Sequence, residues 1–197
     1  MPPGSSPRVS IIYGSPSDQN VMRQAGAMLA RFGVSYDEAS ISAHRAPRAL
    51  ADWIAELEPR GIEVVIAGAG MSAALPGVVA AHTILPVIGV PVRGGAMDGL
   101  DALLAITQMP PGVPVACVGL DNAKNAAVLA VQIMAVHDPA LRVRLAQFKE
   151  DFEKAAVEGL GGAALELGGA AGVGELARGL GRDLHSPGRD HDAGTRS

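Results

Sequence analysis

The chain has 197 residues, of which 48% are hydrophobic, 18% are charged and only 3% are aromatic, and its formal net charge is −4 at pH 7. This length suits one sizeable domain with a buried core, and the composition is unlike that of a disordered chain. The negative charge argues against a general electrostatic attraction to nucleic acid or to an acidic membrane. The single cysteine, Cys117, excludes an intrachain disulfide and a cysteine-rich metal site.

No segment resembles a signal peptide or a membrane span. The start, residues 1–8, is polar and is not followed by an apolar region of the kind that a signal peptide needs. The most apolar stretch, residues 77–92, is interrupted by His82 and Pro86 and falls short of the roughly 18 apolar residues of a spanning helix. We therefore expect a soluble, cytoplasmic protein without a membrane or nucleic-acid partner.

Five short apolar runs, rich in β-branched residues and bounded by turn residues, predict β-strands. Near-continuous apolar strands of this kind are typical of a parallel sheet that is covered on both faces. Segments with helical periodicity lie between them, so we predict an open, doubly wound α/β fold. The predicted strands are 8–14, 34–42, 63–70, 85–92 and 113–120.

Helices are predicted from apolar residues that recur at helical spacing. The segment 18–33 predicts an amphipathic helix that ends at Gly33, and 48–61 predicts a second helix that Pro59 ends. The segment 122–136 is apolar on nearly all sides, which indicates a buried helix or a subunit contact. The side chains expected to face the core are Val21, Ala25, Met28, Leu29 and Phe32 in the first helix and Leu50, Trp53, Ile54 and Leu57 in the second.

The C-terminal part of the chain differs from the rest. The segment 138–159 predicts a long helix with charge on one side and an apolar stripe on the other, which needs a partner surface. The following residues, 160–197, are rich in glycine and alanine and then polar, and we expect them to be largely disordered. We therefore divide the chain into a folded domain, 8–159, and a tail, 160–197. The stripe consists of Leu141, Leu145, Phe148 and Phe152.

Polar or glycine-rich stretches follow the first four predicted strands, at 14–18, 42–47, 67–77 and 92–101. Ligands of parallel α/β sheets bind outside the carboxyl ends of the strands. All four stretches are therefore expected to meet at one edge of the sheet. Their convergence is stronger evidence for a binding site than any one of them alone.

His44 and Arg45 are the most informative pair in these stretches. The pKa of histidine suits proton transfer near neutral pH, and arginine is the preferred planar partner of a phosphate. A lone histidine more often has a structural role, and this alternative stays open at this point. No second histidine or cysteine lies at ligand spacing from His44, and no acid–histidine–serine spacing predicts a nucleophile.

The stretches 14–18 and 67–77 each have two interpretations. The first is either an ordinary strand-to-helix turn with Pro16, or an anion-binding loop at a helix N-terminus. The second lacks the spacing of a dinucleotide-binding loop. Its glycines either let a helix pack tightly on a strand or bring the N–H groups of Gly70 to Ser72 close to a flat ligand.

Seven motifs appear in order over residues 8–158: "GSPSD", "SAHRAP", "AGAG…LPG", "PVIGVPV", "GLDALL", "QMPPGVPV" and "NAAVLA". Together they resemble the PurE family of purine biosynthesis, which moves a carboxyl group onto aminoimidazole ribonucleotide. The resemblance implies a three-layer, flavodoxin-like fold and an octamer whose sites are shared between subunits. It also implies an imidazole ribonucleotide and CO2 as ligands, and no cofactor: neither biotin, nor ATP, nor a metal.

The resemblance implies roles for the residues that match the family's motifs. His44 matches the catalytic histidine. Ser15 and Asp18 match the ribonucleotide-binding loop, with Asp18 at the ribose hydroxyls. The other implied binding residues are Ser17, Ser42 and Arg45 around the phosphate, and Gly70, Met71, Ser72, Ala74 and Leu75 at the pocket for the carboxylate and CO2.

The predicted activity is a mutase reaction that forms 4-carboxy-5-aminoimidazole ribonucleotide. In it, the carboxyl group of 5-(carboxyamino)imidazole ribonucleotide moves from the exocyclic nitrogen to the ring carbon. One departure leaves alternatives open, because many family members have a histidine just before "LPG", where this chain has Ala74. The segments "GMSAALPGVV" and "VGLDNAKNAAVLA" look closer to a second class, which carboxylates aminoimidazole ribonucleotide directly with CO2. A paralogue that acts on a related nucleotide is the other alternative.

A nucleotide-binding module without catalysis is the alternative from a different functional class. A response regulator needs an acidic cluster at the end of the first strand, and this chain lacks it there. A flavodoxin stacks aromatic side chains on a flavin, whereas most of the few aromatic residues here lie at core-like or terminal-helix positions. Both comparisons disfavour this alternative.

Overall fold

The computed structural model describes residues 6–166 of the chain. Within the whole chain, contacts define two units, 1–147 and 148–197, and the first contains the entire sheet. Most of the predicted tail, from residue 167 onward, lies outside the described residues. No helix among the described residues is both long enough and apolar enough to cross a membrane.

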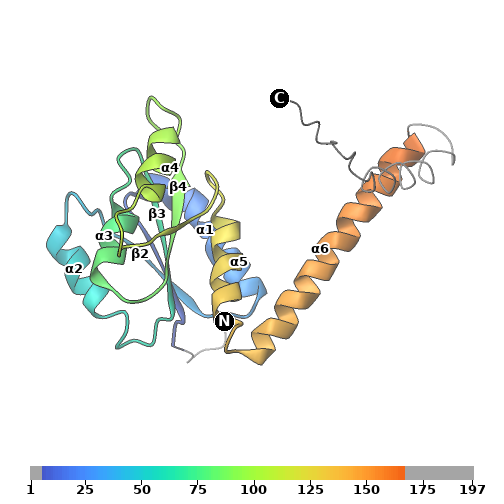
Figure 1. The fold of residues 1–197 in the computed structure, drawn as a ribbon, viewed down its shortest axis with the longest axis horizontal. Coiled ribbons are helices and arrows are strands. Elements are labelled where there is room, and N and C mark those ends of the chain that lie inside the picture. Colours follow the sequence, from blue (N-terminus) through green and yellow to red (C-terminus); the bar gives the residue numbers. More distant parts are fainter. Residues whose placement is uncertain (1–5, 167–197) are drawn as a thin grey trace, which may run out of the picture. The chain divides into compact units, whose positions relative to one another are not determined.

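Five parallel strands form one sheet in the order β2-β1-β3-β4-β5 (Figure 1). This is the strand order of flavodoxin-like folds, in which the direction of winding reverses between β1 and β3. Every residue of β1 and β4 is buried, as expected for strands covered on both faces. The strands are β1 (Val9–Tyr13), β2 (Tyr36–Ser40), β3 (Val64–Gly70), β4 (Val87–Val92) and β5 (Ala116–Cys117).

Helices cover both faces of the sheet and confirm the three-layer, doubly wound fold. Helices α1 and α5 pack together on one face, and α2, α3 and α4 lie on the other (Figure 1). A short 3₁₀ helix, η1 (Pro16–Asp18), precedes α1. The helices are α1 (Gln19–Arg31), α2 (Pro47–Ala55), α3 (Leu75–His82), α4 (Leu100–Thr107), α5 (Ala123–Met134) and α6 (Pro139–Glu166).

All five predicted strands are longer than the observed ones, and for two of them proline explains the difference. The strand predicted over 113–120 contains Pro114, which has no N–H for the ladder, and β5 is reduced to two residues at the sheet edge. The strand predicted from residue 85 begins only after Pro86. Helices α3 and α4 were not predicted, because their short apolar sequences have no polar face to reveal a helical period.

The core faces of the helices follow the predictions in part. In α1 the predicted Ala25 and Leu29 are buried, whereas the predicted Val21 and Met28 are only half-buried and Met22 is buried instead. In α2, Trp53 is likewise half-buried and the other three predicted side chains are buried. Helix α5 is buried as predicted, through Ala123, Ala126, Ala127, Val128, Ala130, Val131 and Met134.

Gly68 lets α1 pack closely on the carboxyl end of β3. A Cβ atom at this position would lie 2.3 Å from Met22 Sδ, which is closer than side chains can approach. The backbone N–H of Gly14 donates to the carbonyl of Gly68 at 3.3 Å, so the end of β1 is tied to the same point. This contact fixes the centre of the sheet edge from which the site is built.

Helix α6 begins on the first unit and continues into the second. Asp138 caps it by accepting the backbone N–H groups of Ala140 and Leu141, each at 3.1 Å, and by pairing with Arg8 at 2.8 Å. The hydrogen bond from Leu141, followed by the one from Arg8, lowers the pKa of Asp138. Along the predicted apolar stripe burial decreases from Leu141, which is fully buried, to Phe152, which is 71% exposed.

Candidate active site

A cavity of about 580 Å³ lies at the carboxyl ends of the first four strands. Its walls come from the segments 14–18, 42–45, 69–75 and 92–95, which follow β1, β2, β3 and β4. Its centre is the point between β1 and β3 where the winding reverses, which is where flavodoxin-like folds bind ligands. Every site residue named from the sequence lines it: Ser15, Ser17, Asp18, Ser42, His44, Arg45, Gly70, Met71, Ser72, Ala74 and Leu75. Their roles in binding and catalysis stay predictions.

The cavity has two halves of different chemistry. The segments 14–18 and 42–45 supply hydroxyl, carboxylate, imidazole and guanidinium groups, and we call them the polar half. The segments 69–75 and 92–95 consist mostly of glycine, alanine and other apolar residues, and we call them the Gly/Ala half. In the sheet, β1 and β2 carry the first half and β3 and β4 carry the second.

The loop after β1 is held together by its own hydroxyl groups. Ser15 is the N-cap of η1, and its Oγ accepts from the backbone N–H of Ser17 at 3.4 Å. The Oγ of Ser17 lies 2.9 Å from Ser15 Oγ and 3.1 Å from Asp18 Oδ1. One hydroxyl proton can serve only one acceptor at a time. The loop therefore carries hydroxyl groups that a phosphate or sugar can engage without breaking the backbone turn.

Asp18 is buried, with 8% of its surface exposed, yet its carboxylate is not used to cap the helix. It stands at the N-cap of α1 and makes no side-chain capping bond. Burial raises the pKa of Asp18, and the hydrogen bonds from Ser17 and from the backbone at Ser15 partly oppose that rise. A buried acceptor beside a cavity is suited to bind hydroxyl donors.

A tight turn after β2 presents His44. The backbone N–H of Ala46 donates to the carbonyl of Ser42 at 2.9 Å, and the N–H of Arg45 donates to Ser42 Oγ at 3.3 Å. Nη2 of Arg45 also donates to the carbonyl of Gly14 at 3.3 Å, which ties this turn to the loop after β1. The imidazole of His44 is exposed at the cavity wall, where a ligand can reach it.

The turn after β3 contains two residues with unusual backbone angles. Met71 has φ = 56° and Ala73 has φ = 36°, in the left-handed region that residues other than glycine seldom occupy. The N–H of Ala73 donates to the carbonyl of Gly70 at 3.1 Å and closes the turn. A Cβ atom at Gly70 would lie 3.1 Å from the carbonyl oxygen of Val92, so only a residue without a side chain fits easily there. Strained turns of this kind cluster at functional sites.

Arg93 also lines the cavity, although no sequence motif singled it out. Its backbone N–H donates to Asp121 Oδ1 at 2.8 Å, its Nε to Asp121 Oδ2 at 3.3 Å and its Nη1 to Asp98 Oδ2 at 2.5 Å. Asp98, more than Asp121, raises the pKa of the guanidinium. The stretch 92–101 was predicted to reach this edge of the sheet, but Asp121 comes from the loop after β5, which no motif connected with Arg93.

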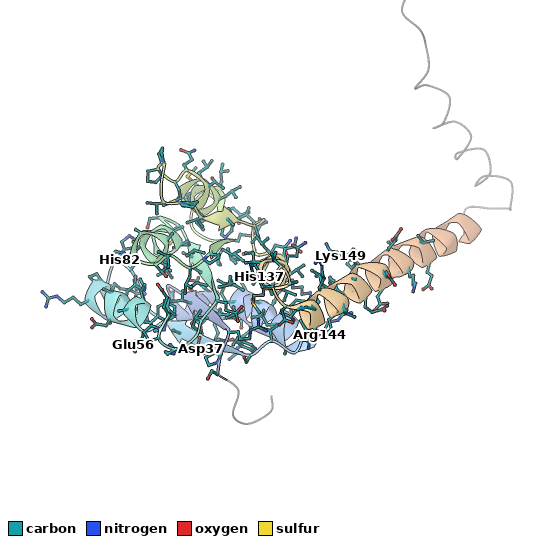
Figure 2. All side chains as sticks on the ribbon, turned by 60° about the horizontal axis from the view of Figure 1, so that its bottom comes forward. Asp37, Glu56, His82, His137, Arg144 and Lys149 are labelled. Atoms are coloured by element: carbon teal, nitrogen blue, oxygen red, sulfur yellow. The ribbon has the colours of Figure 1, made fainter. Side chains whose placement is uncertain are left out.

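Other histidines lie away from the cavity. His82, at the end of α3, has its Nδ1 2.8 Å from the carbonyl of Val78, and His137 follows α5 (Figure 2). Neither residue lines the cavity. Among the described residues, no group of three or more histidine, cysteine, aspartate or glutamate side chains is arranged to hold a metal ion.

The profile of the AIR carboxylase family matches residues 8–155. The chain belongs to the AIR carboxylase family. The match covers almost the same segment as the seven motifs and confirms the predicted resemblance. As an AIR carboxylase family member, the chain is an enzyme with the flavodoxin-like fold described above.

Similar members of the AIR carboxylase family are named N5-carboxyaminoimidazole ribonucleotide mutase. One from Pyrococcus abyssi is 52% identical over 148 residues, which are 75% of this chain and 85% of that protein. One from Thermotoga maritima is 49% identical over 152 residues, which are 77% of this chain and 89% of that protein. Among solved structures, PurE of Treponema denticola is 28% identical with a TM-score of 0.72, covering 77% of this chain and 95% of that one.

Proposed function

We propose that the chain is an N5-carboxyaminoimidazole ribonucleotide mutase of purine biosynthesis. The observation that carries this proposal is that one cavity gathers every predicted site residue in a chain about half identical to proteins of that name. The polar half supplies the groups that a ribonucleotide needs, and the Gly/Ala half supplies a small apolar space. The proposed reaction uses both.

The polar half binds the ribose and the phosphate. Ser17, Ser42 and Arg45 surround the phosphate, and the guanidinium of Arg45 makes charge-assisted hydrogen bonds to it. Asp18 accepts hydrogen bonds from the ribose hydroxyls, because its buried carboxylate is not engaged by the helix. Ser15 completes the loop through its hydroxyl group.

His44 moves the proton that the rearrangement requires. The N–C bond of the carbamate breaks, CO2 leaves, and protonated His44 delivers a proton to the exocyclic nitrogen. The electron-rich ring carbon then attacks CO2 and forms a C–C bond, and neutral His44 removes the proton from that carbon. The histidine returns to its starting state, atoms and electrons balance, and no oxidant or nucleoside triphosphate is consumed. Positioned acid–base catalysis of this kind supplies about 10²–10⁴-fold in rate.

The Gly/Ala half keeps CO2 beside the ring between the two steps. Ala69, Ala73 and Leu75 are buried and line the cavity, and Gly70 lets β4 approach closely. A small apolar space holds CO2 against the ring carbon and so favours recapture by proximity. It also excludes water, which would otherwise hydrate the released molecule.

Two parallel incubations test the proposed reaction and its nearest alternative. Purified protein is given N5-carboxyaminoimidazole ribonucleotide in one, and aminoimidazole ribonucleotide with bicarbonate in the other, and the carboxylated product is followed by its ultraviolet absorbance. Rapid product formation from the first substrate, with the second slower at equal concentration, is the expected result. Preferred turnover of the second would instead establish direct carboxylation, the alternative that Ala74 raises, and turnover of neither would overturn both.

We also propose that the enzyme works in the cytoplasm as a homo-oligomer, an octamer by the family resemblance. Its support is the exposed apolar side chains of α6, including Val143 and Phe152, and of α4, including Leu100 and Leu104. Apolar surface of this kind usually marks subunit contacts. Light scattering is expected to give an oligomer for the full chain and dissociation or aggregation after truncation at Val136, and a monomeric full chain would contradict the proposal.

A further inference from the structure

Arg93 lines the cavity without a role in the proposed reaction. It directly follows β4, and Val92 pairs in register with Gly70 of β3. A Cβ atom at Gly95 would lie 3.3 Å from Met71 Cγ, so the segment after β4 packs against the turn after β3. Arg93 therefore belongs to the Gly/Ala half, and β1 and β3 separate its strand from β2.

Two carboxylates from different loops orient the guanidinium of Arg93. Asp121 accepts from both its backbone N–H and its Nε, and the N–H of Asp121 donates in turn to the carbonyl of Pro91 at 2.9 Å. Asp98 accepts from Nη1. Asp98 and Asp121 have φ = 49° and φ = 55°, so the backbone adopts uncommon angles at both partners. Within residues 6–166, no group accepts a hydrogen bond from Nη2, whose two N–H groups remain for a ligand.

The two carboxylates do not remove the attraction of this guanidinium for an anion. The side chain of Asp98 is 70% exposed, so that solvent screens its charge strongly, and that of Asp121 is 33% exposed and shares its charge with a backbone N–H. The side chain of Arg93 is itself 52% exposed. A planar guanidinium matches a carboxylate in shape as well as in charge.

The proposed substrate carries two anionic groups at opposite ends, a phosphate and a carboxyl group. Arg45 lies among the serine hydroxyls of the polar half and is tied to Gly14, so it serves the phosphate end. Arg93 lies across the cavity on the side of β3 and β4. The two arginines thus stand in different halves, as the two anionic groups of the substrate require.

We propose that Arg93 binds the carboxyl group of the ribonucleotide and that Asp98 and Asp121 hold the guanidinium in place for it. The inference rests on the proposed function, since it assumes an imidazole ribonucleotide with its phosphate in the polar half. It makes Arg93 the residue by which the chain distinguishes a carboxylated ribonucleotide from its decarboxylated counterpart. Arg45 contributes equally to binding of both.

Calorimetric titration of the full-length protein with two ribonucleotides tests this assignment. The ligands are 4-carboxy-5-aminoimidazole ribonucleotide and aminoimidazole ribonucleotide, which differ only in the carboxyl group. Arg93→Gln is expected to weaken binding of the first by about tenfold and to leave binding of the second nearly unchanged. The matched control is Arg8→Gln, because Arg8 also pairs with two carboxylates, Glu63 and Asp138, but lies outside the cavity.

The ratio of the two dissociation constants separates a binding role from a structural one. If Arg93 only stabilised its loop, Arg93→Gln would weaken the binding of both ligands equally and leave the ratio unchanged. That result would overturn the inference but not the proposed function. If Arg93→Gln fails to fold, Arg93→Lys takes its place, because lysine keeps the charge but not the planar shape. Arg93→Lys is expected to shift the same ratio by about threefold. An unchanged ratio for Arg93→Lys would also overturn the inference. If the unsubstituted chain bound neither ribonucleotide, the proposed function and this inference would fall together.

Discussion

The two halves of the cavity are built on the same sheet edge but by different means. In the polar half, side chains form the walls. Ser17 bonds to Ser15 within one loop, and Arg45 donates to Ser42 within the other and to the carbonyl of Gly14 between the two. In the Gly/Ala half, glycine backbone and mostly small side chains form the wall, and the pairing of β3 with β4 at Gly70 holds it. Loops rich in polar groups are suited to bind a ribose phosphate, whereas a wall made mostly of glycine and alanine leaves room for a molecule as small as CO2.

The largest expected effect separates proton transfer from binding within the polar half. His44→Asn is expected to lower kcat by about 10²–10⁴-fold and to leave ribonucleotide affinity within about tenfold, because the proposed role of the side chain is to move protons and not to hold the phosphate. Steady-state kinetics and calorimetric titration measure the two quantities. The control is His82→Asn, whose histidine lies outside the cavity; near-normal turnover of His44→Asn would remove His44 from the mechanism.

A smaller effect is expected for the phosphate contact. Arg45→Ala removes the proposed charge-assisted hydrogen bond to the phosphate. Such a bond contributes about 1.5–3 kcal/mol, so KM is expected to rise by more than tenfold while kcat changes less. Arg48→Ala, on the exposed side of α2, provides a comparison with the same loss of charge outside the cavity. An unchanged KM for Arg45→Ala would show that the phosphate binds elsewhere.

One glycine from each half compares the two kinds of wall. A Cβ atom at Gly70 would lie 3.1 Å from the carbonyl of Val92, whereas one at Gly14 would meet no atom within 4 Å. Gly70→Ala is therefore expected to lower the free energy of unfolding by about 1 kcal/mol and to reduce turnover, because it overfills the backbone wall. Gly14→Ala is expected to change stability by less than about 0.5 kcal/mol. Urea denaturation measures both, and equal effects would remove the distinction between the halves.

The smallest expected effect concerns the stability cost of the buried carboxylate. Because burial raises the pKa of Asp18 in the folded state, the folded chain binds its proton more readily than the unfolded chain does. The contribution of Asp18 to stability therefore falls as the pH rises from the unfolded pKa, 3.8, through the raised folded pKa. Asp18→Asn should be at least as stable as the unsubstituted chain at neutral pH, although its ribonucleotide affinity falls.

The pH dependence of the stability difference between Asp18→Asn and the unsubstituted chain tests this prediction. The difference in unfolding free energy between Asp18→Asn and the unsubstituted chain should shrink as the pH falls toward about 4, where Asp18 takes up its proton in both states. Urea titrations across this range measure it. The opposite result would be an Asp18→Asn variant that is less stable than the unsubstituted chain at neutral pH and becomes relatively more stable on acidification. It would mean that the carboxylate stabilises the fold.

The central strands were predictable because both of their faces are buried, which leaves uninterrupted apolar runs such as that of β3. The edge strands were less predictable. Strand β2 contains only half-buried and exposed residues, and β5 is limited to Ala116 and Cys117. Helices α3 and α4 were not predicted, because their apolar residues do not concentrate on one side and their sequences therefore show no amphipathic periodicity.

The composition of the cavity wall was predictable because parallel strands end at one edge, so the residues after each strand meet there. Arg93 was not predictable as part of a pair, since its partner Asp121 follows a different strand and only the fold brings the two together. The positive φ angles of Met71 and Ala73 also had no signal in the sequence, because methionine and alanine rarely adopt them.

The fate of the carboxyl carbon tests most directly whether the Gly/Ala half holds CO2. N5-carboxyaminoimidazole ribonucleotide labelled with ¹³C in its carboxyl group is converted by the enzyme in a buffer that contains unlabelled bicarbonate, and mass spectrometry follows the label into the product. A cavity that keeps CO2 beside the ring predicts that the product retains nearly all of the label. A product whose label has equilibrated with the buffer would contradict this account, because the released CO2 would then have left the cavity before the ring carbon captured it.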